Sequence, residues 1–280
     1  MSILDKLNNK EIKLSKSHKI LLEYIKKNIN DVSYKSISEI ADESNLSKAT
    51  ITRFIQTMGF DSFKEFQIEI AKETRYQNNE NIINSSITQN DSLIDVAYKL
   101  IESSSIILQK NFRNLDIHKI NTCVEKILKS RRIYFVGIGY SGNIAMEYSY
   151  KFMRIGINCN YFVDSHTMIA LSSIMDKDDL VIAISHTGNT REVIKSCKLA
   201  AQNNSTVISI TSNENSQLSK ISNVSINYIS DESLFETGSL STKTVQGFLL
   251  DLIYTQVVKS RFKESTDKKI ITTHAIKNNT

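Results

Sequence analysis

The amino-acid sequence predicts two domains of different class, an all-α N-terminal domain and a C-terminal α/β domain with a doubly wound, five-stranded parallel sheet. Three observations support this prediction. Residues 1–76 carry helical patterns only, and short apolar segments alternate with amphipathic ones from residue 132 onward. A polar, Asn-rich segment without periodicity, residues 77–90, lies between these two regions and is typical of a linker.

The composition is that of a globular protein. The 280 residues are 40% hydrophobic and 23% charged, and the net charge of +5 permits a nucleic-acid partner. The three cysteines lack the spacing of metal ligands, which predicts reduced thiols and no metal site. The start of the chain has no apolar signal core and no segment is long enough to span a bilayer, so we expect a cytoplasmic protein without a membrane partner.

The N-terminal region has the spacing of a helix-turn-helix. Apolar residues at helical spacing predict a first helix over residues 14–29, and SISEIADES (36–44) predicts a second that opens with a capping box of Ser36 and Glu39. A third helix is expected over residues 47–57. Asn45 lies in the two-residue turn before it, where the backbone needs a positive φ that Asn tolerates.

The third helix divides into two faces. Ile51, Phe54 and Ile55 are predicted to face the core. A small and polar face beside basic residues is typical of a helix that enters the major groove of DNA, although a plain three-helix bundle would show a similar pattern. The expected DNA-contacting residues are Ser47, Lys48, Ala49, Thr52, Arg53 and Gln56.

The segments IADESNLSKATITRF and MGFDSFKEFQ resemble the N-terminal domain of RpiR-family bacterial transcriptional regulators. The resemblance implies a helix-turn-helix that binds DNA. Asn45 departs from it mildly, because Gly is more usual at that position.

The C-terminal region is predicted to be a doubly wound sheet of flavodoxin type. Strands are expected over residues 132–137, 158–163, 180–184, 206–210 and 224–229, and helices over 91–109, 116–129, 141–155, 167–175, 191–202 and 240–260, with a further short helix before the last strand. The predicted boundaries are 1–76 for the DNA-binding domain, 77–107 for a linker and connecting helix, and 108–262 for the α/β domain. Residues 263–280 are expected to form a polar, solvated or frayed tail.

Two strand ends in this sheet carry the residues of a ligand site. Residues 180–190, LVIAISHTGNT, run from a buried strand into a turn with three hydroxyls and a glycine at the start of a helix. Backbone N–H groups and the helix dipole favour an anion at such a position. The second, GIGYSG (137–142), also satisfies the glycine pattern of a dinucleotide site, and Asp164 could meet a ribose. An NAD-sensing regulator is therefore one interpretation, but two hydroxyl-bearing turns on one crevice favour a small phosphorylated sugar.

The segments RIYFVGIGYSGNIAMEYSYKFMRIG, LVIAISHTGNTREVIKSCKLA and ETGSLSTKTVQGFLLDLIY resemble the SIS (sugar isomerase) phosphosugar-binding domain. With the N-terminal match, the order of domains is that of RpiR-family regulators. The resemblance implies that Ser185, Thr187, Gly188 and Thr190 hold the phosphate and that Ser141 contributes a hydroxyl. The full expected ligand set is Gly139, Ser141, Gly142, Ser185, Thr187, Gly188, Thr190 and Ser241.

We therefore expect a homodimeric, or dimer-of-dimers, transcriptional regulator that binds double-stranded DNA and is controlled by a sugar phosphate, with no cofactor. No catalytic residue is predicted, because no carboxylate or histidine is firmly placed as the base that sugar isomerisation needs. The alternatives are a phosphosugar isomerase with an accessory helical domain and the NAD-sensing regulator.

Overall fold

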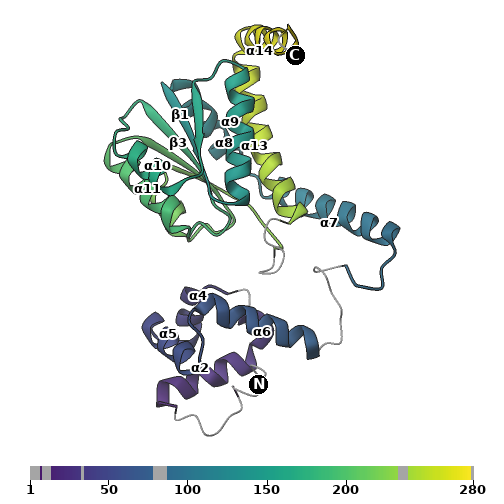
Figure 1. The fold of residues 1–280 in the computed structure, drawn as a ribbon, viewed down its shortest axis with the longest axis vertical. Coiled ribbons are helices and arrows are strands. Elements are labelled where there is room, and N and C mark those ends of the chain that lie inside the picture. The colour runs from purple at the N-terminus through teal and green to yellow at the C-terminus, as the bar shows by residue number, and fades with distance from the viewer. Residues whose placement is uncertain (1–6, 8–13, 33–34, 78–86, 233–238, 279–280) are drawn as a thin grey trace. The chain divides into compact units, whose positions relative to one another are not determined.

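The structure of the chain is a computed structural model that describes residues 7, 14–32, 35–77, 87–232 and 239–278 (Figure 1). It divides into two compact units, one formed mainly by residues 1–99 and the other by residues 100–231 and 238–280. The predicted linker coincides largely with residues 78–86, which lie outside the described residues. None of the described helices is long and apolar enough to cross a membrane.

The N-terminal unit is helical, as predicted. Its described helices are α2 (Lys16–Lys27), α3 (Ile29–Val32), α4 (Ile37–Ser44), α5 (Lys48–Thr57) and α6 (Phe63–Gln77). The first predicted helix is divided in two, because Asn28 ends α2 by donating both its backbone N–H and its side-chain amide to the carbonyl of Tyr24. The capping box of Ser36 and Glu39 opens α4, and Asn45 ends α4 with a φ of 53°. The predicted helix-turn-helix is therefore confirmed.

The second unit is built on a five-stranded parallel sheet, which confirms the predicted fold class. The strands are β1 (Arg132–Val136), β2 (Cys159–Phe162), β3 (Asp179–Ile184), β4 (Thr206–Thr211) and β5 (Val224–Asn227), in the order β2-β1-β3-β4-β5. All four pairings are parallel. The order reverses between β1 and β3, and this is where doubly wound sheets bind ligands.

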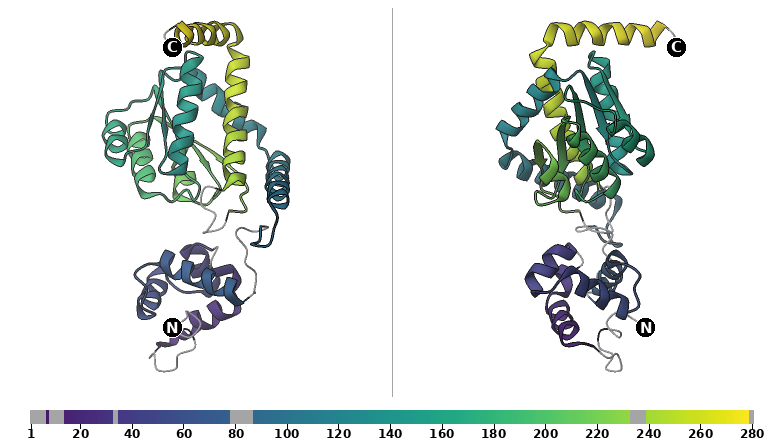
Figure 2. Two further views of the ribbon diagram at one scale, coloured as in Figure 1. Left: turned by 45° about the vertical axis from the view of Figure 1, so that its right-hand side comes forward. Right: turned by 90° about the vertical axis from the view of Figure 1, so that its left-hand side faces the viewer.

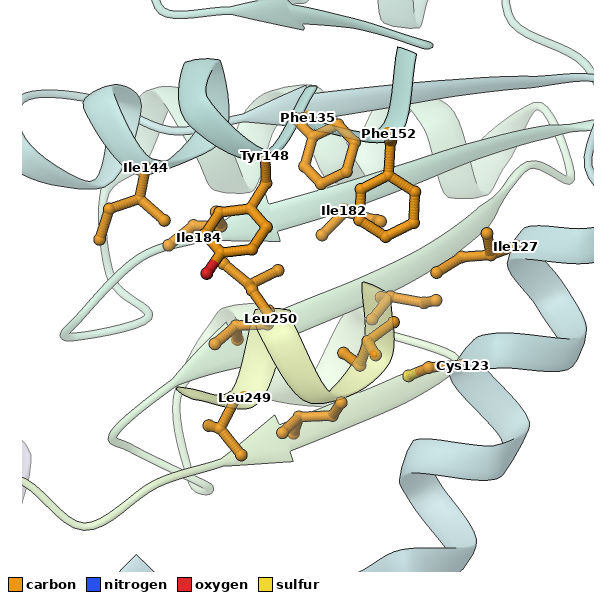
Figure 3. Packing of buried hydrophobic residues seen from close by; sticks show 14 of the residues in the cluster. Cys123, Ile127, Phe135, Ile144, Tyr148, Phe152, Ile182, Ile184, Leu249 and Leu250 are labelled. Atoms are coloured by element: carbon orange, nitrogen blue, oxygen red, sulfur yellow. The ribbon is translucent and has the colours of Figure 1, made fainter. Parts of the chain in front are cut away.

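Helices cover both faces of the sheet. The helices of this unit are α7 (Leu93–Arg113, which begins before residue 100), α8 (Ile117–Lys129), α9 (Tyr140–Arg154), α10 (Ser165–Ser172), α11 (Arg191–Gln202), α12 (Gln217–Ile221), α13 (Leu240–Ser260) and α14 (Phe262–Asn278). Helices α8, α9 and α13 pack together on one face and α10, α11 and α12 on the other. Ile182 of β3 points to the first face, where it packs with Phe135, Phe152 and Leu250 (Figure 3), and Val181 points to the second.

The C-terminal residues were predicted to form a solvated or frayed tail. Most of the described ones are exposed, but the prediction of a frayed end is wrong. They form α14, which crosses the end of α13 (Figure 2). Arg154 at the end of α9 donates to Thr273 Oγ1 at 2.6 Å. Gly156, with a φ of +83°, leaves room for Lys268, whose Cγ would lie 2.8 Å from a Cβ at that position. The sequence carries no signal for this helix because its apolar residues do not form a clear buried face. Ile270 and Ile271, for example, are exposed.

Candidate functional site

The turn between β3 and α11 brings together the hydroxyls that the sequence singles out. Ser185 is buried and Thr190 half-buried, and their hydroxyl oxygens lie 2.9 Å apart. Thr190 is the N-cap residue of α11, but its side chain makes no capping hydrogen bond. Thr187 is exposed, and its Oγ1 accepts from the backbone N–H of Asn189 at 3.2 Å. The first turn of α11 is therefore not capped by Thr190, which leaves its positive end suited to an anion.

Gly188 shapes this turn. Its φ is +64°, and a Cβ at this position would lie 2.2 Å from Ser216 Oγ and 2.8 Å from Thr211 Oγ1. The Gly188 carbonyl accepts from the backbone N–H of Leu218 at 3.1 Å, so the start of α12 packs directly on the turn. Only glycine fits this position without displacing α12.

The turn between β1 and α9 is formed by GIGYSG, and its glycines are required by close backbone packing. A Cβ on Gly137 would lie 2.7 Å from the carbonyl oxygen of Ser141, and one on Gly142 would lie 2.9 Å from that of Gly137. Gly139, with a φ of 60°, is the N-cap residue of α9 and supplies no side-chain cap. Ser141 is half-buried in the first turn of this helix.

The two turns lie at the same edge of the sheet. Strands β1 and β3 are neighbours, and Val136 at the end of β1 is paired with Ala183 near the end of β3. Helices α9 and α11 then leave toward opposite faces of the sheet. The turns therefore flank the point where the strand order reverses, which confirms that the two marked strand ends are adjacent.

The start of α13 supplies a third group of polar side chains. Ser239 caps this helix by accepting from the backbone N–H of Thr242, and its hydroxyl lies 3.0 Å from that of half-buried Ser241. Lys243 Nζ lies 4.9 Å from the ring centroid of Tyr140, the first residue of α9. This cation links α13 to the GIGYSG turn. Lys243 was not among the predicted ligand residues, although it follows directly on the hydroxyl-rich segment SLST.

The predicted DNA-reading face of α5 is exposed. All six expected residues (Ser47, Lys48, Ala49, Thr52, Arg53 and Gln56) are exposed, whereas Ile51, Phe54 and Ile55 are at most 1% exposed. Ser47 also caps α5, because its hydroxyl accepts from the backbone N–H of Thr50. The helix therefore presents a small, polar and basic surface while its apolar residues hold it in the core.

Comparison with known proteins agrees with both halves of this architecture. Residues 1–78 match the helix-turn-helix domain of the rpiR family, and residues 126–256 match the SIS domain. An uncharacterized HTH-type transcriptional regulator of Clostridium perfringens is 45% identical over 278 residues, which cover 99% of this chain and all of that protein. The chain belongs to the RpiR family of transcriptional regulators.

A second sequence relative and a solved structure extend the comparison. An uncharacterized HTH-type transcriptional regulator of Haemophilus influenzae is 30% identical over 260 residues, covering 92% of this chain and 90% of the relative. Among solved structures, the Vibrio vulnificus NanR protein complexed with ManNAc-6P is 24% identical with a TM-score of 0.82, covering 100% of this chain and 99% of NanR. At that identity the NanR structure shows that the two proteins share a fold.

In this RpiR-family chain, Asp164, the acidic residue of the NAD interpretation, is the N-cap residue of α10. Its carboxylate accepts from the backbone N–H and the hydroxyl of Thr167, at 2.9 and 3.0 Å, and so caps α10. These hydrogen bonds lower the pKa of Asp164. Both hydrogen bonds are accepted by Oδ1 of the exposed carboxylate, so the cap does not by itself exclude a contact with a ribose.

The end of the sheet that carries the two turns also contains a set of hydrogen-bonded polar side chains that was not predicted from the sequence. His186 Nδ1 lies 3.0 Å from the hydroxyl of Tyr228, and Gln246 Nε2 donates to that hydroxyl at 2.6 Å. The carbonyl of His186 accepts from Thr211 Oγ1 at 3.0 Å. Among the described residues, no cluster of three or more His, Cys, Asp or Glu could hold a metal ion.

Proposed function

We propose that this RpiR-family chain is a DNA-binding transcriptional regulator whose affinity for its operator is set by a phosphorylated sugar. The observation that carries the proposal is the pair of hydroxyl-bearing turns on neighbouring strands, one of which opens α11 without a side-chain cap. A phosphate suits that position because it satisfies backbone N–H groups, hydroxyls and the helix dipole at once.

The proposed ligand residues divide between phosphate and sugar. Ser185, Thr187, Gly188 and Thr190 are proposed to bind the phosphate. Gly139, Ser141 and Gly142 from the first turn and Ser241 from α13 are proposed to face the sugar hydroxyls. The ManNAc-6P complex of NanR, which shares the fold, supports a sugar phosphate as the ligand class.

DNA binding is proposed to reside in α5, through Ser47, Lys48, Ala49, Thr52, Arg53 and Gln56. Each chain presents one such helix, so a homodimer or dimer of dimers would read two half-sites. We propose that the protein acts in the cytoplasm, where its buried thiols stay reduced. Burial raises the pKa of Cys123 and of Cys197 to about 12, which disfavours reactive thiolates.

We further propose that the chain binds its sugar phosphate without converting it. The relatives compared above are transcriptional regulators. Isomerisation would require a base at the carbon beside the carbonyl. Incubating the protein with hexose and pentose phosphates and following the aldose-to-ketose ratio by NMR tests this point. Turnover would assign the chain to the isomerases instead.

A thermal-shift screen tests the ligand class. The probes are N-acetylmannosamine 6-phosphate, glucosamine 6-phosphate and glucose 6-phosphate, each beside its unphosphorylated sugar and inorganic phosphate, with NADH as the competing candidate. A ligand that binds only the native state at 100 times its Kd stabilises the fold by about 2.7 kcal/mol. We expect a shift with at least one sugar phosphate and none with its unphosphorylated sugar. A shift with NADH alone would overturn the proposal.

A further inference from the structure

Asn111 of α7 forms a paired hydrogen bond with the backbone beyond the edge of the sheet. Its Oδ1 accepts from the backbone N–H of Ile229 at 2.8 Å, and its Nδ2 donates to the carbonyl of Ile229 at 2.9 Å. Nδ2 also donates to the carbonyl of Ile107 at 2.9 Å. Asn111 is 5% exposed. Its amide thus provides the donor and acceptor that a neighbouring strand would provide.

The position of Ile229 explains why such a partner is needed. β5 is an edge strand of the sheet and ends at Asn227, so Ile229 lies two residues beyond it. Within the described part of the chain, no strand pairs with the outer side of β5. The Asn111 amide therefore joins α7 directly to the segment that leaves the end of β5.

The same segment contacts the proposed ligand site. Tyr228, which is 3% exposed, shares a hydrogen bond with His186 of the SHTGNT turn, and its hydroxyl accepts from Gln246 of α13. Ser230 Oγ lies 2.9 Å from Thr242 Oγ1 in the first turn of α13. Residues 228–230 are therefore bonded to the ligand turn, to the start of α13 and to α7. Displacing this segment would break several partly buried hydrogen bonds, so we expect it to shift together with its partners.

Helix α7 is the element through which a movement of residues 228–230 would be transmitted beyond the α/β domain. It follows the linker in the chain, and the division between the two compact units falls inside it, between Lys99 and Leu100. Lys110, one residue before Asn111, forms an exposed ion pair with Asp231 at 3.3 Å. Both contacts connect the C-terminal half of α7 to residues that follow β5.

We propose that Asn111 is the positioning residue through which an occupied ligand turn acts on α7 and changes the affinity of the protein for DNA. The inference rests on the proposed function, because it assumes a sugar phosphate at the SHTGNT turn. A purely structural role of Asn111 predicts a different effect of its replacement. In that case, loss of the Asn111 amide would lower stability but leave the effect of the ligand on DNA binding unchanged.

The test compares the full-length parent with Asn111→Ala and with Asn114→Ala. Asn114 is a matched control because it is exposed and its side chain donates to the carbonyl of Lys110 in α7, at 2.8 Å. The DNA is an operator selected by the protein from a random pool, and the sugar phosphate is the one with the largest thermal shift in the panel above. Calorimetry gives its Kd, and a mobility-shift assay gives the operator Kd without it and at saturation.

The expected result separates binding from coupling. In the parent, saturating sugar phosphate should change the operator Kd by at least about fivefold, the lower end of common coupling energies. In Asn111→Ala the change should fall to less than about twofold, with the Kd values for the sugar phosphate and the ligand-free operator within about threefold of the parent. Asn114→Ala should behave as the parent. Full retention of the ligand effect in Asn111→Ala overturns the inference alone, whereas a parent that binds no sugar phosphate overturns the proposed function as well.

A second measurement applies if Asn111→Ala does not fold. Asn111→Asp keeps the acceptor for the Ile229 N–H but loses the donor, and we expect a reduced effect of the ligand on DNA binding. Hydrogen exchange of the parent needs no variant at all. Saturating sugar phosphate should alter exchange in peptides covering residues 100–113 and 222–232 together. Unchanged exchange in residues 100–113 would contradict a connection through Asn111.

Discussion

Ser185 and Thr190 share a hydrogen bond across the turn that joins β3 to α11, with their hydroxyl oxygens 2.9 Å apart. This contact takes the N-cap residue of α11 away from the end of its own helix. An ordinary Thr N-cap stabilises a helix by about 1 kcal/mol, which α11 forgoes. The turn is therefore organised around a shared polar centre at the helix N-terminus, an arrangement that an anion would complete.

Replacing the hydroxyls of this turn tests that interpretation. Ser185→Ala or Thr187→Ala should raise the Kd for the sugar phosphate about tenfold to more than a hundredfold, because a hydrogen bond to a charged group contributes about 1.5–3 kcal/mol. Isothermal titration calorimetry measures this change. Thr122→Ala is the matched control, since the Thr122 hydroxyl donates to the carbonyl of His118 within α8. Equal affinities in all three variants would mean that the phosphate is held elsewhere.

Gly188 offers a test of the turn that does not depend on the ligand. Gly188→Ala should lower the free energy of unfolding, because the Cβ meets Ser216 and Thr211 and the φ of +64° is unfavourable for Ala by about 1–2 kcal/mol. Gly247→Ala is the contrasting control. It lies inside α13, where the nearest atom to a Cβ is 3.7 Å away, so Ala should be neutral or stabilise by up to about 1 kcal/mol. Urea unfolding of the parent and both variants measures these free energies. A Gly188→Ala variant as stable as the parent would show that α12 can move off the turn.

The features that the sequence predicted correctly depend on local patterns. The buried strand that contains Val181 and Ile182 is apolar without alternation because helices cover both faces of the sheet, and this pattern predicts a parallel strand. Asn45 could be assigned to the turn before α5 because few residue types accept a φ of 53°. The turn SHTGNT between β3 and α11 was located in the same way, because its six residues are consecutive, whereas phosphate binding by its hydroxyls stays a prediction.

The features that it missed depend on contacts between distant positions. Asn111 and Ile229 are 118 residues apart, and a single Asn in a helix gives no periodic signal for such a pairing. The contact between His186 and Tyr228 could not be predicted either, because the two residues are 42 positions apart in the sequence. The docking of α14 likewise depends on Arg154, which is 119 residues from Thr273.

The exposed face of α5 leads to a prediction about DNA. Arg53→Ala and Lys48→Ala should weaken operator binding, by about 1–3 kcal/mol where the side chain reads a base. Lys259→Ala on α13 removes the same charge from the α/β domain and serves as the control. Mobility-shift titrations at one fixed salt concentration measure the effect, because phosphate contacts vary with salt. If Lys259→Ala weakens binding as much as the two α5 variants, net charge and not the reading helix accounts for the loss.

A buried carboxylate joins β1 and β3 at the N-terminal ends of the strands, opposite the two turns. Asp179 at the start of β3 is fully buried, and Arg132 at the start of β1 donates to its two oxygens at 2.9 and 2.7 Å. Burial by itself would raise the pKa of Asp179. Hydrogen bonds from the Arg132 side chain, the Asp176 backbone and the Arg131 side chain outweigh this effect, so the pKa lies below its ordinary value of 3.8.

This lowered pKa predicts how stability depends on pH. Asp179 binds protons less readily when folded than when unfolded, so its contribution is complete above the unfolded pKa of about 3.9 and is lost as the pH falls through the folded value. Asp179→Asn should therefore be less stable than the parent at pH 7, by about 1–3 kcal/mol, and should lose less stability between pH 5 and pH 3. Urea midpoints across this range measure both effects. Asp231→Asn, which breaks an exposed ion pair with Lys110, should change stability by less than about 1 kcal/mol. A parent and an Asp179→Asn variant with parallel pH profiles would show that Asp179 contributes nothing to acid sensitivity.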